Sequence, residues 1–244
     1  MNKYIRGIIF DYGGTLDTNG VHWSEVLWSN YQELNLAVSK EDFREAYVYG
    51  ERSMALNPLV KPEHTFYDVL FIKSRLQLTY LVEHRKLDET EYPLEEYVKK
   101  LAEKGYDKAL SMVKKSRLVV ERLRTKYKLV LVSNFYGNIN KILEDFGLLC
   151  YFESIIESSV VGVRKPDPAI YALGVEAMGF PAEEIVVVGD SFSKDMVPAH
   201  TVGCKTVWLK GVGWGGEEID ESLPDAIISD LEELSTVIDQ IQLL

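Results

Sequence analysis

Short apolar runs that stop at small polar residues recur along the 244 residues of this chain. Such runs, bounded by turn residues, are typical of buried strands. The three clearest are residues 8–10 before Asp11, 128–132 before Ser133, and 185–188 before Gly189 and Asp190. Helical periodicity fills much of the chain between them. We therefore expect right-handed strand-helix-strand connections and a parallel sheet, with these polar residues at its carboxyl edge.

The other elements of the sheet follow from the same pattern. Further strands are expected over residues 154–156, 205–209 and 226–228, and helices over 106–125, 138–146, 169–178 and 231–241. A helix carrying Asp195 is expected after Asp190. Residues 211–216 are rich in glycine but lack the Lys-Ser/Thr of a nucleotide-binding loop, so they are interpreted as a turn. The pattern predicts the α/β fold class.

A long helical stretch interrupts this alternation after the first strand. From residue 22 to about residue 115 the apolar residues follow helical periodicity, with a helix start at Ser39 and breaks at Pro58 and Pro62. A connection of this length is too long for a simple loop. We expect an all-α domain over residues 18–114, inserted into a sheet domain made of residues 1–17 and 115–244.

Charge and composition limit the kinds of partner. The formal net charge of -11 repels phosphate backbones, so nucleic acid is not an expected partner. Small phosphates still bind to acidic proteins through a metal ion and a few placed cations. No apolar run is long enough for a membrane span or a signal peptide, and the two cysteines, Cys150 and Cys204, follow no metal-ligand spacing. The sequence predicts a cytoplasmic protein without membrane contact, and it specifies no oligomeric state.

Four groups of polar residues are expected at the carboxyl edge of the sheet or in the loops beside it. They are Asp11, Ser133 with Asn134, Lys165, and Asp190 with Asp195. Each has a simpler explanation when taken alone, because aspartates and serines are common in turns and helix caps, and most lysines are solvated. Together they supply a carboxylate nucleophile, a hydroxyl, a cation and an acid pair suited to a metal ion.

These residues resemble the motifs of the haloacid dehalogenase superfamily of phosphotransferases. The resemblance rests on Asp11-x-x-Gly14-Thr15, Ser133, Lys165-Pro166, and Gly189-Asp190 with Asp195 after it, all in the order of the family. The helical stretch also stands where the family has a helical cap. The resemblance implies a Rossmann-like three-layer parallel sheet core with an inserted all-α cap domain.

The resemblance also implies how the chemistry is divided. Asp11 would attack phosphorus to form an aspartyl-phosphate, which water then cleaves. Mg2+ bound by Asp11, Asp190 and the backbone carbonyl of Gly13 would neutralise the charge of the phosphate. Lys165 would place a positive charge on the transferring group, and Asp195 would orient Lys165 or the waters of the metal.

The phosphate-binding groups implied by the resemblance come from two loops. Ser133 would donate a hydrogen bond to the phosphoryl oxygens, with Asn134 beside it. The backbone N–H groups around Gly13 and Gly14 would complete the cradle, together with Lys165. The expected activity is that of a Mg2+-dependent phosphatase acting on a small phosphorylated metabolite.

One position departs from the family pattern. Phosphatases of the family most often carry a second aspartate two residues after the nucleophile, as general acid and base, and this chain has Gly13 there. Such a group typically contributes about 10² to 10⁴ in rate. We expect a bias toward leaving groups of low pKa, such as those of sugar 1-phosphates, acyl phosphates or aryl phosphates. Asp17 and His22 are the nearest candidates to supply the proton.

Two other readings remain open at this stage. The 2-haloacid dehalogenases of the family also lack the second aspartate, but they usually have tyrosine at the position of Gly13, and they use no metal. A protein that binds a phosphorylated ligand without turnover is the other reading. The helical stretch also carries cations and aromatics that could touch a substrate. Long cationic side chains on helices are usually solvated, and aromatics at helical spacing usually lie in the core, so none of these residues is assigned to substrate: Trp23, Arg52, His64, Tyr67, Arg75, His84 and Arg85.

Overall fold

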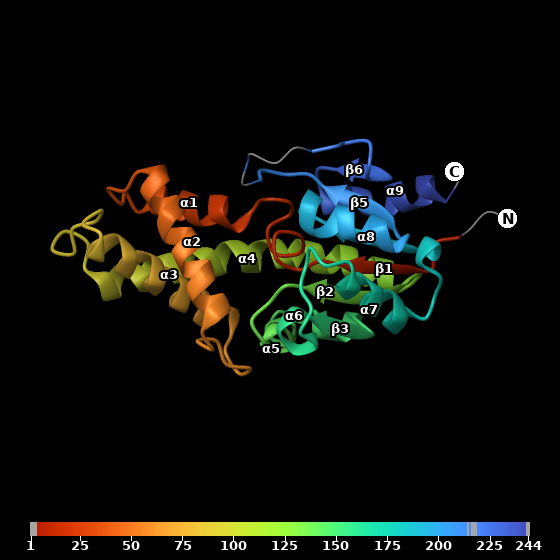
Figure 1. Ribbon diagram of the computed structural model, residues 1–244, viewed down its shortest axis with the longest axis horizontal. Coiled ribbons are helices and arrows are strands. Elements are labelled where there is room, and N and C mark those ends of the chain that lie inside the picture. Colours follow the sequence, from red (N-terminus) through yellow and green to blue (C-terminus); the bar gives the residue numbers. More distant parts are fainter. Residues whose placement is uncertain (1–3, 214, 216–218, 243–244) are drawn as a thin grey trace.

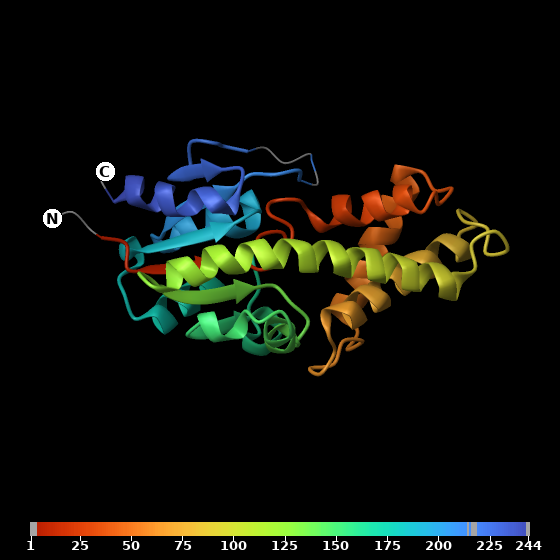
Figure 2. The ribbon, with the colours of Figure 1, turned by 180° about the vertical axis from the view of Figure 1, so that it is seen from behind.

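The computed structural model describes residues 4–213, 215 and 219–242. It has an elongated shape, with a sheet at one end and a group of helices at the other (Figure 1). Two chain segments connect these ends: the loop after the first strand, and one long helix that runs along most of the molecule (Figure 2).

The sheet has six parallel strands, in the order β3-β2-β1-β4-β5-β6. The strands are β1 (Gly7–Phe10), β2 (Lys128–Ser133), β3 (Ser154–Glu157), β4 (Ile185–Gly189), β5 (Lys205–Leu209) and β6 (Ala226–Ile228). The strands predicted from the sequence are therefore confirmed to within a residue or two at their ends. Because β1 lies between β2 and β4, the loops after these three strands meet at the centre of the carboxyl edge.

Helices cover both faces of the sheet, which makes three layers. Alternate residues of β1 belong to different apolar clusters. Ile8 and Phe10 share one cluster with the helices of residues 94–124, 139–145 and 234–241, whereas Ile9 shares another with the helices of residues 169–178 and 197–202. The helices of the sheet domain are α5 (Ile139–Asp145), α6 (Ser158–Val161), α7 (Ala169–Met178), α8 (Val197–Val202) and α9 (Leu234–Ile241). This is the Rossmann-like α/β architecture that the sequence predicts.

Between β1 and β2 the described chain is helical. It forms α1 (Trp23–Glu33), α2 (Lys40–Leu56), α3 (Phe66–Glu83) and α4 (Leu94–Arg124). The predicted start at Ser39 is confirmed, because the Ser39 side chain accepts a hydrogen bond from the Asp42 backbone N–H. Thr65 and Asp68 form a capping box at the start of α3. These local signals explain why the two helices begin where they do.

The helix α4 is longer than the sequence pattern predicts. The expected helix began at residue 106, whereas α4 begins at Leu94 and runs without a break through residue 114. Its first half packs on α3 and α1, and its second half packs under the sheet (Figures 1 and 2). The expected division between residues 114 and 115 therefore lies inside a continuous helix.

Two other segments differ from expectation or lie partly outside the structure. The predicted helix after Asp190 begins as a π-helical turn, η3 (Phe192–Met196), and continues as α8. The glycine-rich turn predicted over residues 211–216 includes Trp214 and Gly216, which lie outside the described residues. Among the helices described, no stretch combines the length and the apolar character needed to cross a lipid bilayer.

Candidate active site

The central strands of the sheet deliver the candidate residues to one place. Asp11 directly follows β1, Ser133 is the last residue of β2, and Asp190 directly follows β4. The Asp11 backbone N–H donates to the Val188 carbonyl at 3.0 Å, which extends the pairing of β1 and β4 up to Asp11, the candidate nucleophile. Asp11 and Ser133 are buried, with 6% and 1% of their surface exposed.

Lys165 is the cation of the site and joins two carboxylates. Its Nζ lies 2.6 Å from Oδ1 of Asp11 and 2.7 Å from Oδ1 of Asp195, and all three side chains are buried. Burial lowers the pKa of Lys165, but the charges of Asp11 and Asp195 outweigh burial and raise the pKa overall. Lys165 is therefore held as a cation directly against the candidate nucleophile.

Asn134 holds the loop that carries Lys165. Its Nδ2 donates to the Lys165 carbonyl at 3.1 Å, and its Oδ1 accepts from the Lys165 N–H at 2.9 Å. The amide thus forms a two-point bridge between the end of β2 and the Lys165 loop. The phosphate-binding role expected for Asn134 stays a prediction, and its contacts here are those of a residue that positions Lys165.

Asp195 is fixed by two further contacts that the sequence did not indicate. The Tyr171 hydroxyl of α7 donates to Oδ1 at 2.7 Å, and the Ser191 N–H donates to Oδ2 at 3.0 Å. Tyr171 is fully buried, and its position on an apolar helix face gave no sign of a polar role. Its pairing with Asp195 depends on how α7 packs against β2, β3 and α8, which local sequence patterns do not encode.

The acidic residues form a compact cluster. One carboxylate oxygen from each of Asp11, Asp190 and Asp195 lies within 4.8 Å of the other two. The Thr15 hydroxyl lies 3.3 Å from Oδ2 of Asp11 and 3.2 Å from Oδ1 of Asp190. If all three carboxylates are ionised, the cation Lys165 balances one of them and two negative charges are left in this cluster.

This cluster fits a divalent metal ion. Magnesium prefers carboxylate and carbonyl oxygens, and a divalent cation balances two negative charges. Gly14 also lets Asp190 come close, because a Cβ on Gly14 would clash with both carboxylate oxygens of Asp190. Asp11 and Asp190 are the residues that would hold the ion, since Asp195 is already committed to Lys165, Tyr171 and Ser191.

Burial and crowding act on the two acids that would bind the ion. Burial raises the pKa of Asp11, against the opposing charge of Lys165. Burial, followed by the charges of Asp11 and Asp195, raises the pKa of Asp190 well above its usual range. Both directions mean that a nearby positive charge is needed to keep the pair ionised at neutral pH.

The surroundings of Gly13 are open. A Cβ built on Gly13 meets no atom within 4 Å, and the backbone there has no positive φ. The space in which a second aspartate would project is therefore free of other protein atoms near the backbone. The carbonyl of Gly13 as a metal ligand and its N–H as part of the phosphate cradle stay predictions.

The two candidate proton donors differ in protonation. Burial raises the pKa of Asp17 to about 7, and its oxygens accept hydrogen bonds from the Gly14 N–H at 2.7 Å and Trp23 Nε1 at 2.9 Å. Burial lowers the pKa of His22 to about 4, and its Nδ1 accepts from the Ser24 N–H as the cap of α1. His22 is therefore neutral at pH 7, whereas Asp17 is protonated in a substantial fraction of molecules.

The residues of the helical insert noted in the sequence lie in different environments. Trp23 contacts the loop after β1, residues 11–20, because its Nε1 donates a hydrogen bond to Asp17. Arg75 pairs with Glu95 on the outer surface, and the His84 ring stacks on Tyr80. Three other residues of this region, Tyr47, Glu51 and Lys73, form a polar cluster of their own.

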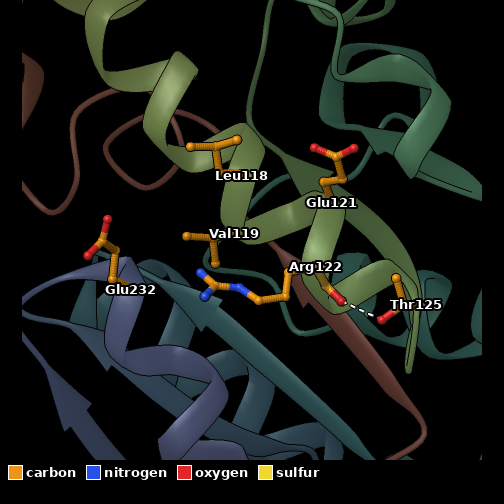
Figure 3. A pocket seen from close by; sticks show the side chains of 6 residues that line it. All are labelled: Leu118, Val119, Glu121, Arg122, Thr125 and Glu232. Carbon is orange, nitrogen blue, oxygen red and sulfur yellow. Dashed lines mark hydrogen bonds between the residues drawn. The ribbon is translucent and has the colours of Figure 1, made fainter.

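A hollow elsewhere on the molecule is separate from this site. It measures about 570 Å³ and lies between the exposed face of α4 and the turn at Glu232 (Figure 3). Its lining residues are Leu118, Val119, Glu121, Arg122, Thr125 and Glu232. None of them belongs to the acidic cluster.

Comparison with known proteins gives the chain its relatives. A family model described as haloacid dehalogenase-like hydrolase matches residues 5–203. Haloacid dehalogenase-like hydrolase domain-containing protein 3 of Danio rerio is 36% identical over 104 residues, which are 43% of this chain and 43% of that protein. The phosphoserine phosphatase of Thermus thermophilus is 31% identical over 118 residues, which are 48% of this chain and 46% of that protein. The matches thus span less than half of these curated relatives.

A solved structure supports the same fold. The 2-haloacid dehalogenase of Pseudomonas syringae pv. Tomato has a TM-score of 0.51 and 22% identity, and the match covers 97% of this chain and 99% of that one. The family model covers the nucleophile loop, the Lys165 loop and the acidic pair together. The chain belongs to the haloacid dehalogenase-like hydrolases.

Proposed function

We propose that this hydrolase is a Mg2+-dependent phosphatase that acts on a small phosphorylated metabolite through an aspartyl-phosphate. The observation that carries the proposal is the buried Lys165 ammonium, 2.6 Å from Asp11, beside a cluster with two excess negative charges. A phosphate dianion approaches a carboxylate only where cations offset the repulsion. When bound by Asp11 and Asp190, Mg2+ supplies that charge.

The side chains of the site divide the first half of the reaction among them. An oxygen of Asp11 attacks phosphorus, a new O–P bond forms, and the bond to the leaving-group oxygen breaks. Lys165 stabilises the negative charge of the transferring group, and Asp195 and Asn134 hold Lys165 in place. Water then attacks the phosphoryl group, which returns Asp11 to its carboxylate and releases inorganic phosphate.

This site has no evident group that donates a proton to the leaving group. Gly13 brings no carboxylate, and Asp17 already accepts hydrogen bonds at both of its oxygens. Leaving groups of low pKa depart without a proton, so we propose that they are favoured over simple alkyl oxyanions.

The helical insert belongs to the same proposal. We propose that residues 18–114 act as a cap on a core made of residues 1–17 and 115–244. The Tyr136 hydroxyl of the core donates to Glu51 Oε2 at 2.9 Å, and Asn138 Nδ2 donates to the His64 carbonyl at 2.8 Å. These bonds draw the insert over the carboxyl edge of the sheet, where closure excludes water from the reaction.

Dehalogenation of a 2-haloacid is the second candidate, because it shares the nucleophile, the lysine and the fold. The excess of negative charge in the acidic cluster favours the phosphatase, since a metal-free site that attracts a haloacid carboxylate needs a surplus of cations instead. The Thermus thermophilus relative is also named a phosphatase.

One assay distinguishes these functions. The purified chain with Mg2+ should release phosphate from p-nitrophenyl phosphate, lose this activity with EDTA, and lose at least about 10³-fold in kcat as Asp11→Asn. Chloride release from 2-chloropropionate without metal would support the dehalogenase instead. Binding of phosphate without turnover of any ester would support a ligand-binding protein.

A further inference from the structure

A buried charged pair lies in the helical insert, outside the residues that perform the chemistry. Lys73 of α3 has 9% of its side chain exposed, and its Nζ lies 2.6 Å from Oε1 of Glu51 on α2. Burial disfavours both charges, but the charge of each group outweighs burial at the other. The pKa of Lys73 is therefore raised and that of Glu51 lowered, so the pair stays ionised. Buried ion pairs seldom add stability over apolar residues of similar size, so stability alone does not explain why this pair is present.

Two tyrosine rings enclose the ammonium group. Lys73 Nζ lies 5.9 Å from the Tyr47 ring centroid and 5.8 Å from the Tyr136 ring centroid. Among the described residues, Glu51 is the one whose oxygen lies within ion-pair distance of this ammonium. An ammonium has three N–H donors, and the partners of Lys73 are the Glu51 carboxylate and the Tyr136 hydroxyl, which leaves one donor for a ligand.

The same cluster is partly exposed and borders the acidic site. About a third of the Glu51 side chain, 32%, is exposed, whereas its Oε1 atom is buried against Lys73. Tyr136 stands two residues after Asn134, and its neighbour Phe135 packs edge-on against Tyr12, the residue after Asp11, at 5.8 Å between ring centroids. In Figures 1 and 2 the second half of α2 lies beside the loop after β2.

From this placement we propose that Glu51, Lys73, Tyr47 and Tyr136 bind the leaving group, and that they select a neutral, hydroxylated one, as in a sugar 1-phosphate. The inference rests on the phosphatase activity proposed above. Glu51 accepts from a hydroxyl and Lys73 donates to one, while the tyrosine rings pack on the C–H faces of the carbon chain.

The charge balance excludes the other common class of leaving group. A carboxylate, as in phosphoglycolate or phosphoserine, brings a second negative charge, and Lys73 is already neutralised by Glu51 at 2.6 Å. Such a group would meet the carboxylate of Glu51 without a spare cation of this cluster. Hydroxyl groups carry no such penalty.

Tyr136 links this selection to the closed position of the insert. Its hydroxyl belongs to the core and donates to Glu51 Oε2 at 2.9 Å, which orients the carboxylate toward the core loop. The binding groups are therefore assembled from both parts of the chain.

The test compares kcat/KM for two esters of similar size, glycerol 1-phosphate and phosphoglycolate. The wild type should prefer the glycerol ester by about 10-fold or more, the range expected for hydrogen-bonded recognition. Glu51→Gln leaves Lys73 as an uncompensated cation, so the preference should fall at least about 10-fold through improved KM for phosphoglycolate. The double variant Glu51→Gln with Lys73→Met should lose the preference without this improvement.

Two controls keep the result interpretable. Glu96→Gln breaks an exposed ion pair with Lys100 on α4, at 2.5 Å, and should keep the wild-type preference. Affinities of Asp11→Asn for the same two esters, measured by calorimetry, report the selection even if turnover is absent. Inert p-nitrophenyl phosphate would overturn the phosphatase proposal alone, whereas equal affinity for both esters, or a preference for phosphoglycolate, would overturn this inference.

Discussion

Gly13 and Gly14 stand side by side in the nucleophile loop but have different surroundings. Gly14 has a φ of +97°, and a Cβ there would meet the Asp190 carboxylate, whereas a Cβ on Gly13 meets nothing within 4 Å. Gly14→Ala should therefore cost about 2 kcal/mol of unfolding free energy and displace Asp190, while Gly13→Ala should stay within about 0.5 kcal/mol of the wild type. Urea denaturation of both variants checks this. Equal stabilities would mean that the loop relaxes around the new methyl group.

The open space at Gly13 also allows a gain-of-function test. Gly13→Asp places a carboxylate where phosphatases of the family have their acid and base, so kcat/KM for an alkyl phosphate should rise about 10- to 100-fold. The rate for p-nitrophenyl phosphate should change much less, because nitrophenolate leaves without a proton. Steady-state kinetics on both esters measure the difference. An equal change in kcat/KM for the two esters would show that proton supply does not limit this enzyme.

Single residues were the level at which the sequence was most informative about the site. Asp11 and Asp190 were recognisable because each follows an apolar strand directly, and Lys165 because it stands in a loop beside a proline. Tyr171 and Lys73 could not be recognised, because each lies on a helix and gains its polar partner from a different element. Pairing of that kind is set by tertiary packing and leaves no local signal.

Among the elements, α1 carries a pH-dependent cap. His22 accepts from the Ser24 N–H at its N-terminus, and burial lowers the pKa of His22 to about 4. The unfolded chain binds a proton near pH 6.5 and the folded chain does not, so this contribution to stability is present above pH 6.5 and is lost as the pH falls toward 4. Between pH 7 and pH 5 the loss amounts to about 2 kcal/mol.

The variant His22→Asn separates the cap from the titration. Asparagine is a good cap residue and does not titrate, so α1 should persist while the part of the pH dependence due to His22 disappears. Denaturation at pH 7 and pH 5 gives the two free energies, and the exposed His200→Asn serves as control. An unchanged pH dependence in His22→Asn would show that the imidazole titrates equally in both states.

Elements of the sheet were predictable for a reason that does not extend to α4. A buried parallel strand is a short apolar run with turn residues at both ends, and the four central strands β2, β1, β4 and β5 are of this kind. The edge strands β3 and β6 are partly exposed, but each still contains a short apolar run. The helix α4 has different apolar faces in its two halves, because the first half packs on helices and the second under the sheet. Its sequence pattern therefore looked like two elements, although no residue breaks the helix.

At the scale of the whole molecule, the metal site proposed for the acidic cluster would link metal binding to stability. Burial and the neighbouring charges of Asp11 and Asp195 raise the pKa of Asp190, so the ionised carboxylate destabilises the metal-free fold at neutral pH. Asp190→Asn removes that charge and keeps an oxygen for the Thr15 hydroxyl, which lies 3.2 Å away. In EDTA this variant should therefore melt at a higher temperature than the wild type.

With Mg2+, the wild type should melt at a higher temperature than Asp190→Asn. At about 100 times its dissociation constant, a ligand of the folded state stabilises it by about 2.7 kcal/mol, which for a chain of this size is about 5 to 10 °C in Tm. Asp190→Asn should gain less than about 2 °C, because one ligand and one charge of the site are absent. The exposed Asp239→Asn should gain as much as the wild type. Since α4 joins both parts of the chain, we expect Mg2+ to shift the whole unfolding transition rather than one phase of it. Equal shifts of Tm in the wild type and in Asp190→Asn would place the metal elsewhere.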